Sequence, residues 1–522
     1  MKDITTSIYT FDSIIQGNFL YVDKTEYVWQ LIRPVKEMYF LSRPRRFGKS
    51  LLISTLEAIF KGKKELFQGL ALYSKPYDWQ KHPVIHLDFV NCDSRTPEEL
   101  REYLEHLLQV SADELKLKLR GTGPSMRFEN LMNDAATSSE AHDVVVLVDE
   151  YDKPILGNID DLPRCRELLP VLKGFYSNIK KCEKNIRLAF VTGVSKFSHV
   201  SLFSDLNNLT DITLSPAFAE LLGFTEQEIR TNFADRLPLA AKATGLAKEE
   251  LMRQLLDWYD GYRFSEADTH VCNPVSLSSF FSNSYKFSNY WDSTGTPSFL
   301  LKLMRDQAYD HEAALDKWYS EGVFSSYELE KFDITGLLWQ TGYLTIKDIA
   351  PGLRGTKFRL DFPDFEVADT FMQRLLEFYC QIPKGTGDDF IEDFQQAIVA
   401  DDLDRFMSLL QTFFASIPYD IQLPREKYFQ TVFFVIFRLL GTAIEAESHT
   451  NIGSIDAYVR TAKTIYIFEF KLNQNARKAI AQIIDRHYYE KYQNCGLPIR
   501  LVGVNFDLAK GRLVTWKEHK KP

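Results

Sequence analysis

Over about the first 220 residues of the chain, hydrophobic and polar positions alternate with two different periods. Short aliphatic or aromatic runs predict β-strands, and the longer amphipathic segments between them predict α-helices. This alternation is typical of βα units that build a mostly parallel sheet. The predicted strands are Glu37–Ser42, Val84–Phe89, Val144–Asp149 and Ile186–Thr192, and the predicted helices are Ser50–Phe60, Pro97–Leu117, Met126–Ala135 and Cys165–Lys180.

The pattern changes after residue 224. Residues 225–305 have a mainly helical pattern rich in Trp and Tyr, which indicates a lid or a small second layer. A helix at Asp333–Trp339 and strands at Thr341–Lys347 and Lys357–Leu360 follow, an order compatible with a winged-helix unit. Breakers and acids at Pro383–Asp389 then indicate a linker. The predicted parts are an N-terminal α/β domain (1–224), a helical and winged-helix middle region (225–382), a linker with a connecting helix (383–400) and a C-terminal α/β domain (401–522).

The composition is that of a globular protein. The chain has 522 residues, of which 45% are hydrophobic, and this is enough apolar material for several cores. The apolar runs are far shorter than a membrane span, and Met1–Thr6 shows no signal-peptide pattern, so we expect a cytoplasmic protein without membrane contact. The six cysteines are scattered without a Cys-x-x-Cys pair, which argues against a disulfide framework and a zinc site.

Charge gives a weak indication about the partner. The net charge is −9 at pH 7, but the chain from residue 401 onward is mildly basic, which permits a polyanionic partner there. A chance excess of a few basic residues explains the same pattern equally well.

A phosphate-binding loop is predicted where the first strand ends. The strand Glu37–Ser42 is followed by a turn that ends in Gly48, Lys49 and Ser50, after which the pattern becomes helical. The amides of such a turn and the helix N-terminus together bind phosphate. Gly48 would let the backbone approach the phosphates, Lys49 would reach the β- and γ-phosphates, and the Ser50 hydroxyl would bind Mg²⁺. One departure is Arg43, which stands where the motif has its first glycine.

Two acids downstream support a nucleotide site. The aliphatic run Val144–Val148 leads directly into Asp149 and Glu150. In a nucleotide-hydrolysing fold, the first acid holds the Mg²⁺ shell, and the second orients or deprotonates the attacking water. An ordinary surface turn is the alternative. Thr192, at the tip of the next strand, is a candidate γ-phosphate sensor or, equally, a helix-capping residue.

The sequence leaves the role of the loop arginines open. Arg43, Arg45 and Arg46 either neutralise phosphate charge or reach a neighbouring subunit of a homo-oligomer as arginine fingers, and a solvated basic loop is the alternative. We therefore predict ATP and Mg²⁺ as cofactors, with Glu150 as a catalytic residue. The predicted nucleotide-binding residues are Arg45, Arg46, Gly48, Lys49, Ser50, Asp149 and Thr192.

Three segments together resemble a known family. Tyr39–Ser50, Val148–Pro154 and Thr192–Phe197 look like the corresponding segments of the AAA-ATPase-like family of bacterial proteins. That family commonly carries Arg-Pro-Arg-Arg-Phe-Gly-Lys in place of a full glycine-rich loop, so the resemblance accounts for Arg43. It covers roughly residues 5–220 and implies a P-loop NTPase fold that binds ATP.

A second candidate site follows from strand geometry near the C-terminus. Side chains alternate along a strand, so Glu469 and Lys471 share one face while Phe468 and Phe470 share the other. The Glu-x-Lys pair thus projects an acid and a base together. An exposed ion pair is the ordinary alternative for such residues.

A hairpin would complete this site. A turn near Arg460–Lys463 lets two strands pair, which carries Asp456 to the same edge as Glu469. Two carboxylates so placed hold one or two Mg²⁺ ions, and Lys471 orients or activates water beside a phosphodiester. Glu426, on a preceding helix predicted at 424–440, is a candidate further metal ligand. A helix predicted at Ala476–Tyr492 carries along one side Gln482, Arg486 and Tyr489.

This order of helix, hairpin with an Asp and Glu-x-Lys, and helix resembles the PD-(D/E)xK nuclease superfamily, in the branch attached to AAA-ATPase-like proteins. Phe468–Leu472 and Ala481–Ile483 add to the resemblance. Relatives often show Gly-Arg-Ile-Asp where this chain has Gly453–Asp456 with serine in place of arginine, which affects substrate contact there and not metal binding. The resemblance implies a restriction-endonuclease-like α/β domain whose catalytic residues are Asp456, Glu469 and Lys471.

The sequence therefore predicts an α/β protein with a P-loop NTPase parallel-sheet domain, a helical or winged-helix middle region and a C-terminal nuclease-like domain. Our hypothesis is that ATP binding or hydrolysis gates Mg²⁺-dependent cleavage of nucleic acid, and the resemblance favours DNA. One alternative is a nucleotide-dependent switch or scaffold whose nuclease-like domain binds nucleic acid or protein without cleaving, which the net charge of −9 slightly favours. Another is a DNA-remodelling motor without cleavage.

Overall fold

The chain folds into two compact units, each with its own sheet. The computed structural model describes residues 1–196, 208–291, 298–307, 309, 311–324, 333–383, 386–416, 426–440, 445–447, 457–507 and 513–521. The first unit contains residues 1–294 and 315–367, and the second contains residues 295–314 and 368–522. The division into four parts stays a prediction from the sequence.

A five-stranded parallel sheet forms the centre of the first unit, with the order β2-β3-β4-β1-β5. Its strands are β1 (Glu37–Ser42), β2 (Val84–Asp88), β3 (Val144–Asp149), β4 (Ile186–Gly193) and β5 (Thr210–Asp211). Both β3 and β4 are buried along their whole length, because helices cover the sheet on both faces. The prediction of a mostly parallel α/β sheet is confirmed.

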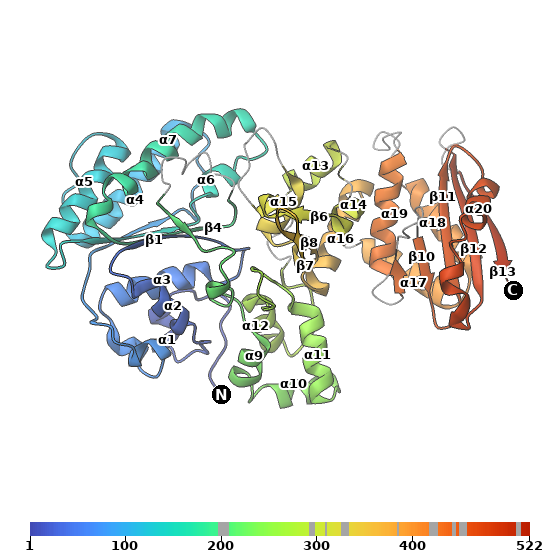
Figure 1. Ribbon diagram of the computed structural model, residues 1–522, viewed down its shortest axis with the longest axis horizontal. Coiled ribbons are helices and arrows are strands. Elements are labelled where there is room, and N and C mark those ends of the chain that lie inside the picture. The colour runs from blue at the N-terminus through green and yellow to red at the C-terminus, as the bar shows by residue number, and fades with distance from the viewer. Residues whose placement is uncertain are drawn as a thin grey trace. The chain divides into compact units, whose positions relative to one another are not determined.

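Helices α1 to α3 lie on one face of this sheet, and α4, α5 and α7 lie on the other (Figure 1). The helices are α1 (Phe11–Gln16), α2 (Thr25–Ile32), α3 (Lys49–Phe60), α4 (Pro97–Leu115), α5 (Gly123–Ser138), α6 (Lys153–Leu156) and α7 (Leu162–Lys181). The start of α4 is fixed by a capping box, in which the Glu99 amide donates to the Thr96 hydroxyl and the Thr96 amide donates to the Glu99 carboxylate. All four helices predicted in this region are present, with ends that differ by a few residues.

The rest of the first unit is helical, with one small antiparallel sheet of order β6-β8-β7. The order α15, β7, β8 reproduces the predicted helix–strand–strand pattern of the middle region. These elements belong to the same compact unit as the parallel sheet. They are α9 (Glu226–Asn232), α10 (Leu237–Thr244), α11 (Lys248–Tyr259), α12 (Pro274–Ser282), β6 (Trp318–Ser320), α15 (Ile334–Thr341), β7 (Thr345–Gly352) and β8 (Gly355–Asp361).

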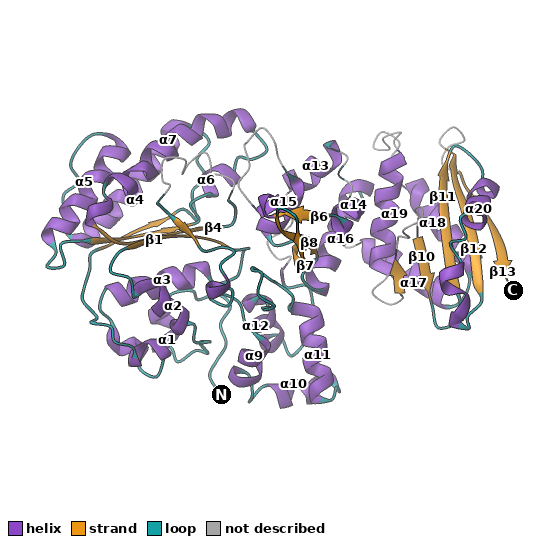
Figure 2. Cartoon of the chain, in the orientation of Figure 1, coloured by secondary structure: helices purple, strands orange, loops and turns teal. Residues whose placement is uncertain are grey.

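The second unit is built on a mixed five-stranded sheet of order β13-β12-β11-β10-β9. The predicted hairpin is present, since β10 and β11 pair antiparallel, while β11 and β12 run parallel. Figure 2 shows α18 and α19 on one side of this sheet and α20 on the other. The elements are α13 (Ser298–Asp306), α14 (His311–Asp316), α16 (Phe365–Cys380), α17 (Thr386–Val399), α18 (Leu403–Ser416), α19 (Glu426–Leu440), β9 (Glu445–Glu447), β10 (Ala457–Arg460), β11 (Ile465–Leu472), α20 (Ala476–Asp485), β12 (Ile499–Asp507) and β13 (Leu513–Lys521).

The last helix is shorter than the sequence predicted. Instead of continuing to Tyr492, α20 ends at Asp485, because His487 adopts the left-handed conformation with φ +57° and reverses the chain. Tyr488 and Tyr489 then turn into the core of the unit. Tyr489 is therefore not on the same helix side as Gln482. Within the described part of the chain, we find no helix with the length and apolar character needed to cross a membrane.

Candidate functional site

The first candidate site is the loop that joins β1 to α3. Gly48 has φ +93° and directly precedes Lys49, the first residue of the helix. Arg46 is also left-handed, with φ +66°, which is uncommon for a residue with a Cβ atom. Left-handed residues just before a helix N-terminus are typical of loops whose backbone amides bind anions.

Lys49 is held in place by the carbonyl groups of its own loop. Its Nζ donates hydrogen bonds to the carbonyl oxygens of Arg43 and Pro44, each at 3.1 Å. The Nζ also lies 4.0 Å from the carboxylate of Glu150, the residue that follows the end of β3. The side chain is 5% exposed. Phosphate oxygens are stronger acceptors than carbonyls for an ammonium group, so a phosphate in the loop would draw these donors to itself.

Ser50 and Asp149 lie near each other beside the loop. Ser50 lies close enough to the Asp149 carboxylate for hydrogen bonding from its hydroxyl to lower the pKa of Asp149. Burial raises the pKa of Asp149, although this hydrogen bonding and the charge of Lys49 oppose the rise. Asp149 is 2% exposed, and its Oδ1 is buried without a hydrogen-bond partner among the described residues. An unpartnered carboxylate oxygen beside a serine hydroxyl fits the oxygen ligands that Mg²⁺ prefers.

Glu150 lies at the tip of β3 with a strained backbone. Its φ is +52°, a left-handed conformation that costs energy for a residue with a Cβ atom. Residues strained in this way cluster at functional sites. The carboxylate is 19% exposed and lies within ion-pair distance of Lys49. It is thus accessible to a ligand in the loop.

Asp152 has a role that the sequence interpretation missed. It is fully buried and accepts hydrogen bonds from the backbone amide and the hydroxyl of Ser195, both at 2.7 Å. Burial raises its pKa to about 6. This carboxylate ties the end of β3 to the end of β4. The signal available in the sequence was its position three residues after Asp149, on the same loop.

Arg43 stabilises the loop from behind. Its guanidinium is 1% exposed and donates to the carbonyls of Ser42, Thr213 and Phe218, at 2.9, 2.8 and 3.3 Å. It also lies over the ring of Phe264, 4.2 Å from the ring centre. Burial lowers its pKa to about 9. Both Nη atoms donate to carbonyl groups of the fold, while Nε is buried without a hydrogen-bond partner among the described residues. A guanidinium buried in this way does not fit the hypotheses of phosphate neutralisation or of an arginine finger.

Thr192, Arg45 and Arg46 were also predicted as nucleotide contacts. The Thr192 hydroxyl donates to the carbonyl of Leu41 at 2.9 Å, and its side chain is fully buried, so it joins β4 to β1. Arg46 donates from Nη1 to the carbonyl of Tyr290 at 2.7 Å. Arg45 and Arg46 both line a cavity beside the loop.

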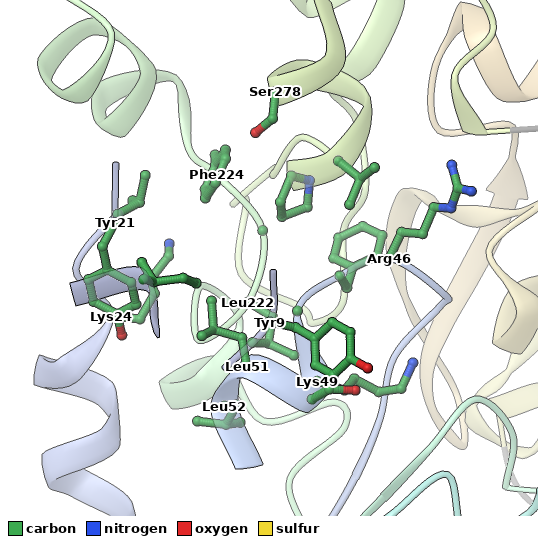
Figure 3. A pocket seen from close by; sticks show the side chains of 18 of the residues that line it. Tyr9, Tyr21, Lys24, Arg46, Lys49, Leu51, Leu52, Leu222, Phe224 and Ser278 are labelled. Carbon is green, nitrogen blue, oxygen red and sulfur yellow. The ribbon is translucent and has the colours of Figure 1, made fainter. Parts of the chain in front are cut away.

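This cavity has a volume of about 400 Å³, which is within the usual range for small-molecule sites. Figure 3 shows Lys49 and Arg46 on one side of it, with the ring of Tyr9 beside Lys49, and shows Leu222, Phe224 and Lys24 on the side away from Arg46. A polar end beside an anion-binding loop and an aromatic end suit a ligand with a phosphate chain and a flat base. The aromatic wall was not predicted, because its residues come from segments distant in sequence.

The second candidate site is the Glu-x-Lys pair on β11. Lys471 donates to Glu469 Oε1 at 2.9 Å, and Gln482 of α20 donates to the same oxygen. Phe468 and Phe470 face α19, where both contact Phe437. The predicted division of the strand into two faces is therefore found.

Glu469 is not an exposed ion-pair residue. Its side chain is 1% exposed, and burial raises its pKa, while the hydrogen bond and charge of Lys471 oppose the rise. Its Oε2 is buried without a hydrogen-bond partner among the described residues. A buried carboxylate oxygen in this position carries a desolvation cost that a bound cation would offset. The residue therefore fits a metal ligand.

A glycine brings α20 close to this strand. Gly503 of β12 is paired with Glu469, and a Cβ atom at Gly503 would lie 2.2 Å from the carbonyl oxygen of Ala476. Only glycine allows this approach. The close packing holds the helix that supplies Gln482 to Glu469.

Two predicted metal ligands cannot be located relative to Glu469. Asp456 lies outside the described residues, one position before Ala457 in the sequence, and Ala457 pairs with Phe468. Glu426 is the first residue of α19, but its side chain is outside the described part. Within the described residues, no group of three or more His, Cys, Asp or Glu side chains is arranged to hold a metal ion.

Comparisons with known proteins find similarities at both ends of the chain. A family model described as "Predicted AAA-ATPase" matches residues 5–203, and a model described as "PD-(D/E)XK nuclease superfamily" matches residues 424–516. An "Uncharacterized protein in vnfD 5'region" of Azotobacter chroococcum mcd 1 is 36% identical over 519 residues, which covers 97% of this chain and 96% of that protein. The similarity therefore extends over both units.

Proposed function

Because the chain belongs to a family that joins an AAA-ATPase-like domain to a PD-(D/E)XK nuclease superfamily domain, we propose that it binds and hydrolyses ATP in the first unit and cleaves nucleic acid in the second. The state of the nucleotide gates a Mg²⁺-dependent cleavage, and DNA is the preferred polymer. Oligomerisation through the loop arginines and a cytoplasmic location stay predictions from the sequence.

One observation carries the nucleotide site: the loop and the tip of β3 converge. Lys49 lies within ion-pair distance of Glu150, and both Ser50 and Lys49 are close enough to Asp149 to lower its pKa, although about 100 residues separate the two segments. The loop amides and Lys49 bind the phosphate chain of ATP. Glu150, with its accessible carboxylate, orients and deprotonates the attacking water.

Ser50 and Asp149 hold the Mg²⁺ ion of the nucleotide. When bound, the ion supplies charge neutralisation at the β- and γ-phosphate oxygens. The closeness of the two side chains and the buried, unpartnered Oδ1 of Asp149 support this assignment, because they bring a hydroxyl oxygen and a carboxylate oxygen to the same place.

The second unit supplies the residues for cleavage. Glu469 and Asp456 hold Mg²⁺, Glu426 is a further candidate ligand, and Lys471 orients the water beside the phosphodiester. The buried, unpartnered Oε2 of Glu469 supports a cation here. Gln482 restrains the same carboxylate, so that its other oxygen keeps a fixed direction.

The test is a cleavage assay on single- and double-stranded DNA and RNA, each end-labelled, with Mg²⁺ or Mn²⁺ and with or without ATP. Glu469→Gln removes the charge of the metal ligand and keeps its shape. Glu490→Gln is the matched control, since Glu490 is an exposed carboxylate of the same unit. We expect cleavage by the parent chain and by the control, and loss of cleavage in Glu469→Gln.

A folded protein that binds ATP and leaves every polymer intact would contradict the nuclease. That result would favour the nucleotide-dependent switch, in which the C-terminal domain binds without cleaving. ATP turnover that DNA stimulates, again without cleavage, would favour a motor.

A further inference from the structure

The nucleotide loop is fastened to a distant segment of the first unit through Arg46. Nη1 of Arg46 donates a 2.7 Å hydrogen bond to the carbonyl of Tyr290. In the same region, the loop packs through Phe47 on Tyr262, with ring centres 4.7 Å apart. The loop conformation and the position of Tyr290 are therefore physically linked.

Glu366 holds the neighbouring residues of that segment. Its Oε1 accepts a 2.6 Å hydrogen bond from the amide of Trp291, and the amide of the preceding Tyr290 donates to the carbonyl of Ser288 at 3.0 Å. The ring of Trp291 packs edge-on against Tyr343 at 4.8 Å. Burial raises the pKa of Glu366 to about 7, hydrogen bonding to its carboxylate opposes this rise, and the positive charge of Arg46 opposes it to a smaller extent. Arg46 therefore supports both the carbonyl of Tyr290 and the charged form of Glu366.

Both places where the chain leaves the first unit lie next to this cluster in sequence. The first unit includes residues up to Thr294 and again from Leu315 to Val367. Trp291 stands three residues before the first boundary, and Glu366 stands one residue before the second, in the opening turn of α16. The two crossings are thus anchored to each other by a single carboxylate.

We propose that Arg46 transmits the state of the nucleotide loop to these two crossings by exchanging its acceptor between the Tyr290 carbonyl and a nucleotide phosphate. The inference rests on the proposed nucleotide site and names how that site controls the second unit. Arg46 is a positioning residue in this scheme, and it does not take part in cleavage.

The exchange has a simple physical cause. A guanidinium binds a charged phosphate oxygen more strongly than a neutral carbonyl, and Arg46 lines the same cavity as Lys49. When Arg46 turns to the phosphate, the Tyr290 carbonyl loses a donor and Glu366 loses a nearby positive charge. The nucleotide thereby has different contacts in the two states, which is the requirement for coupling between sites.

Hydrogen exchange on the full chain tests this coupling. Peptides that contain Tyr290 and Trp291, and peptides that contain Val367, are followed with and without Mg²⁺ and a non-hydrolysable ATP analogue. The Val367 amide is informative because it donates to Asp364 at 2.8 Å in the same turn as Glu366. We expect the nucleotide to speed exchange of these amides about tenfold in the parent chain.

Two variants separate the possible outcomes. In Arg46→Gln, the amides should exchange fast without nucleotide and should not respond to it, even at nucleotide concentrations raised to saturate the site, because the variant also loses one phosphate contact. Arg120→Gln is the control, because Arg120 is a surface residue paired with Asp134 on α5, and it should keep the full response. Nucleotide binding measured in the same samples distinguishes the failures. Binding without any change in exchange, or an unchanged response in Arg46→Gln, overturns the coupling alone, whereas no binding to the parent chain overturns the nucleotide site as well.

Discussion

Replacing Lys49 by alanine tests the nucleotide site at its most sensitive point. In the ligand-free loop, Lys49 makes two hydrogen bonds to carbonyls at 3.1 Å and a loose ion pair with Glu150 at 4.0 Å. With nucleotide bound, these are replaced by charge-assisted hydrogen bonds to phosphate oxygens. Only the difference between the two sets of contacts appears in the affinity.

The size of that difference follows from ordinary magnitudes. Removing one partner of a buried, hydrogen-bonded charge pair costs about 2–5 kcal/mol, and the ammonium–carbonyl hydrogen bonds that Lys49 gives up on binding offset part of this cost. The net loss in Lys49→Ala is therefore about 2–3 kcal/mol, which corresponds to a nucleotide affinity roughly 30- to 150-fold weaker.

The assay is equilibrium binding of a fluorescent ATP analogue, with thermal denaturation to establish that the variants are folded. Lys61→Ala is the matched control, since Lys61 follows the last residue of the same helix and pairs with Glu57, far from the loop in sequence. It should bind nucleotide as the parent chain does. A folded Lys49→Ala with unchanged affinity would refute the assignment of the loop as the phosphate site.

Three further results are expected. Arg43→Lys cannot reproduce the guanidinium's bonds to three carbonyls and should lower the free energy of unfolding by about 2–4 kcal/mol, measured by urea denaturation; an unchanged midpoint would contradict a structural role. Gly503→Ala forces a Cβ atom against the Ala476 carbonyl, so it should lower the free energy of unfolding by about 1–3 kcal/mol and loosen the packing of α20 on the sheet. A thermal midpoint equal to that of the parent chain would argue against this close approach. Burial opposes the ionisation of Glu57, but hydrogen bonds from His86 and Lys61 outweigh the effect of burial and lower the pKa of Glu57 from 4.5 to about 2. The ionised carboxylate therefore stabilises the fold above pH 4.5, and this stabilisation is lost as the pH falls towards 2. Glu57→Gln should therefore flatten the loss of stability between about pH 5 and pH 2, and acid denaturation curves that coincide with those of the parent chain would contradict this.

Local patterns were enough to locate the chemistry along the chain. The aliphatic run that ends in Asp149 is the pattern of a buried strand. The alternation around Glu469 is the pattern of a strand whose two faces differ in polarity. Both patterns are formed by residues that are neighbours in sequence. The strands β1 and β3 were predicted with their observed ends. The hairpin of β10 and β11 was predicted as well, because its turn and its two strands are contiguous in sequence.

Features that depend on distant segments were not predictable in this way. Arg43 resembles a phosphate ligand by position, but the carbonyls of Thr213 and Phe218, both distant in sequence, bind its guanidinium together with the carbonyl of Ser42. The aromatic wall of the cavity and the partnership of Arg46 with Tyr290 likewise require the packed structure. The overlong prediction for α20 shows the same limit, since the left-handed turn at His487 is set by two tyrosines that enter the core.

The most direct test of the whole proposal is the rate of Mg²⁺-dependent cleavage of labelled DNA as a function of ATP concentration, in the parent chain and in Lys49→Ala. We expect the parent rate to change with ATP over the same concentrations at which ATP binds, and we expect the variant to need roughly 30- to 150-fold more ATP for the same change. A parent rate that does not depend on ATP, in protein shown to bind it, would contradict the claim that nucleotide in the first unit governs cleavage in the second.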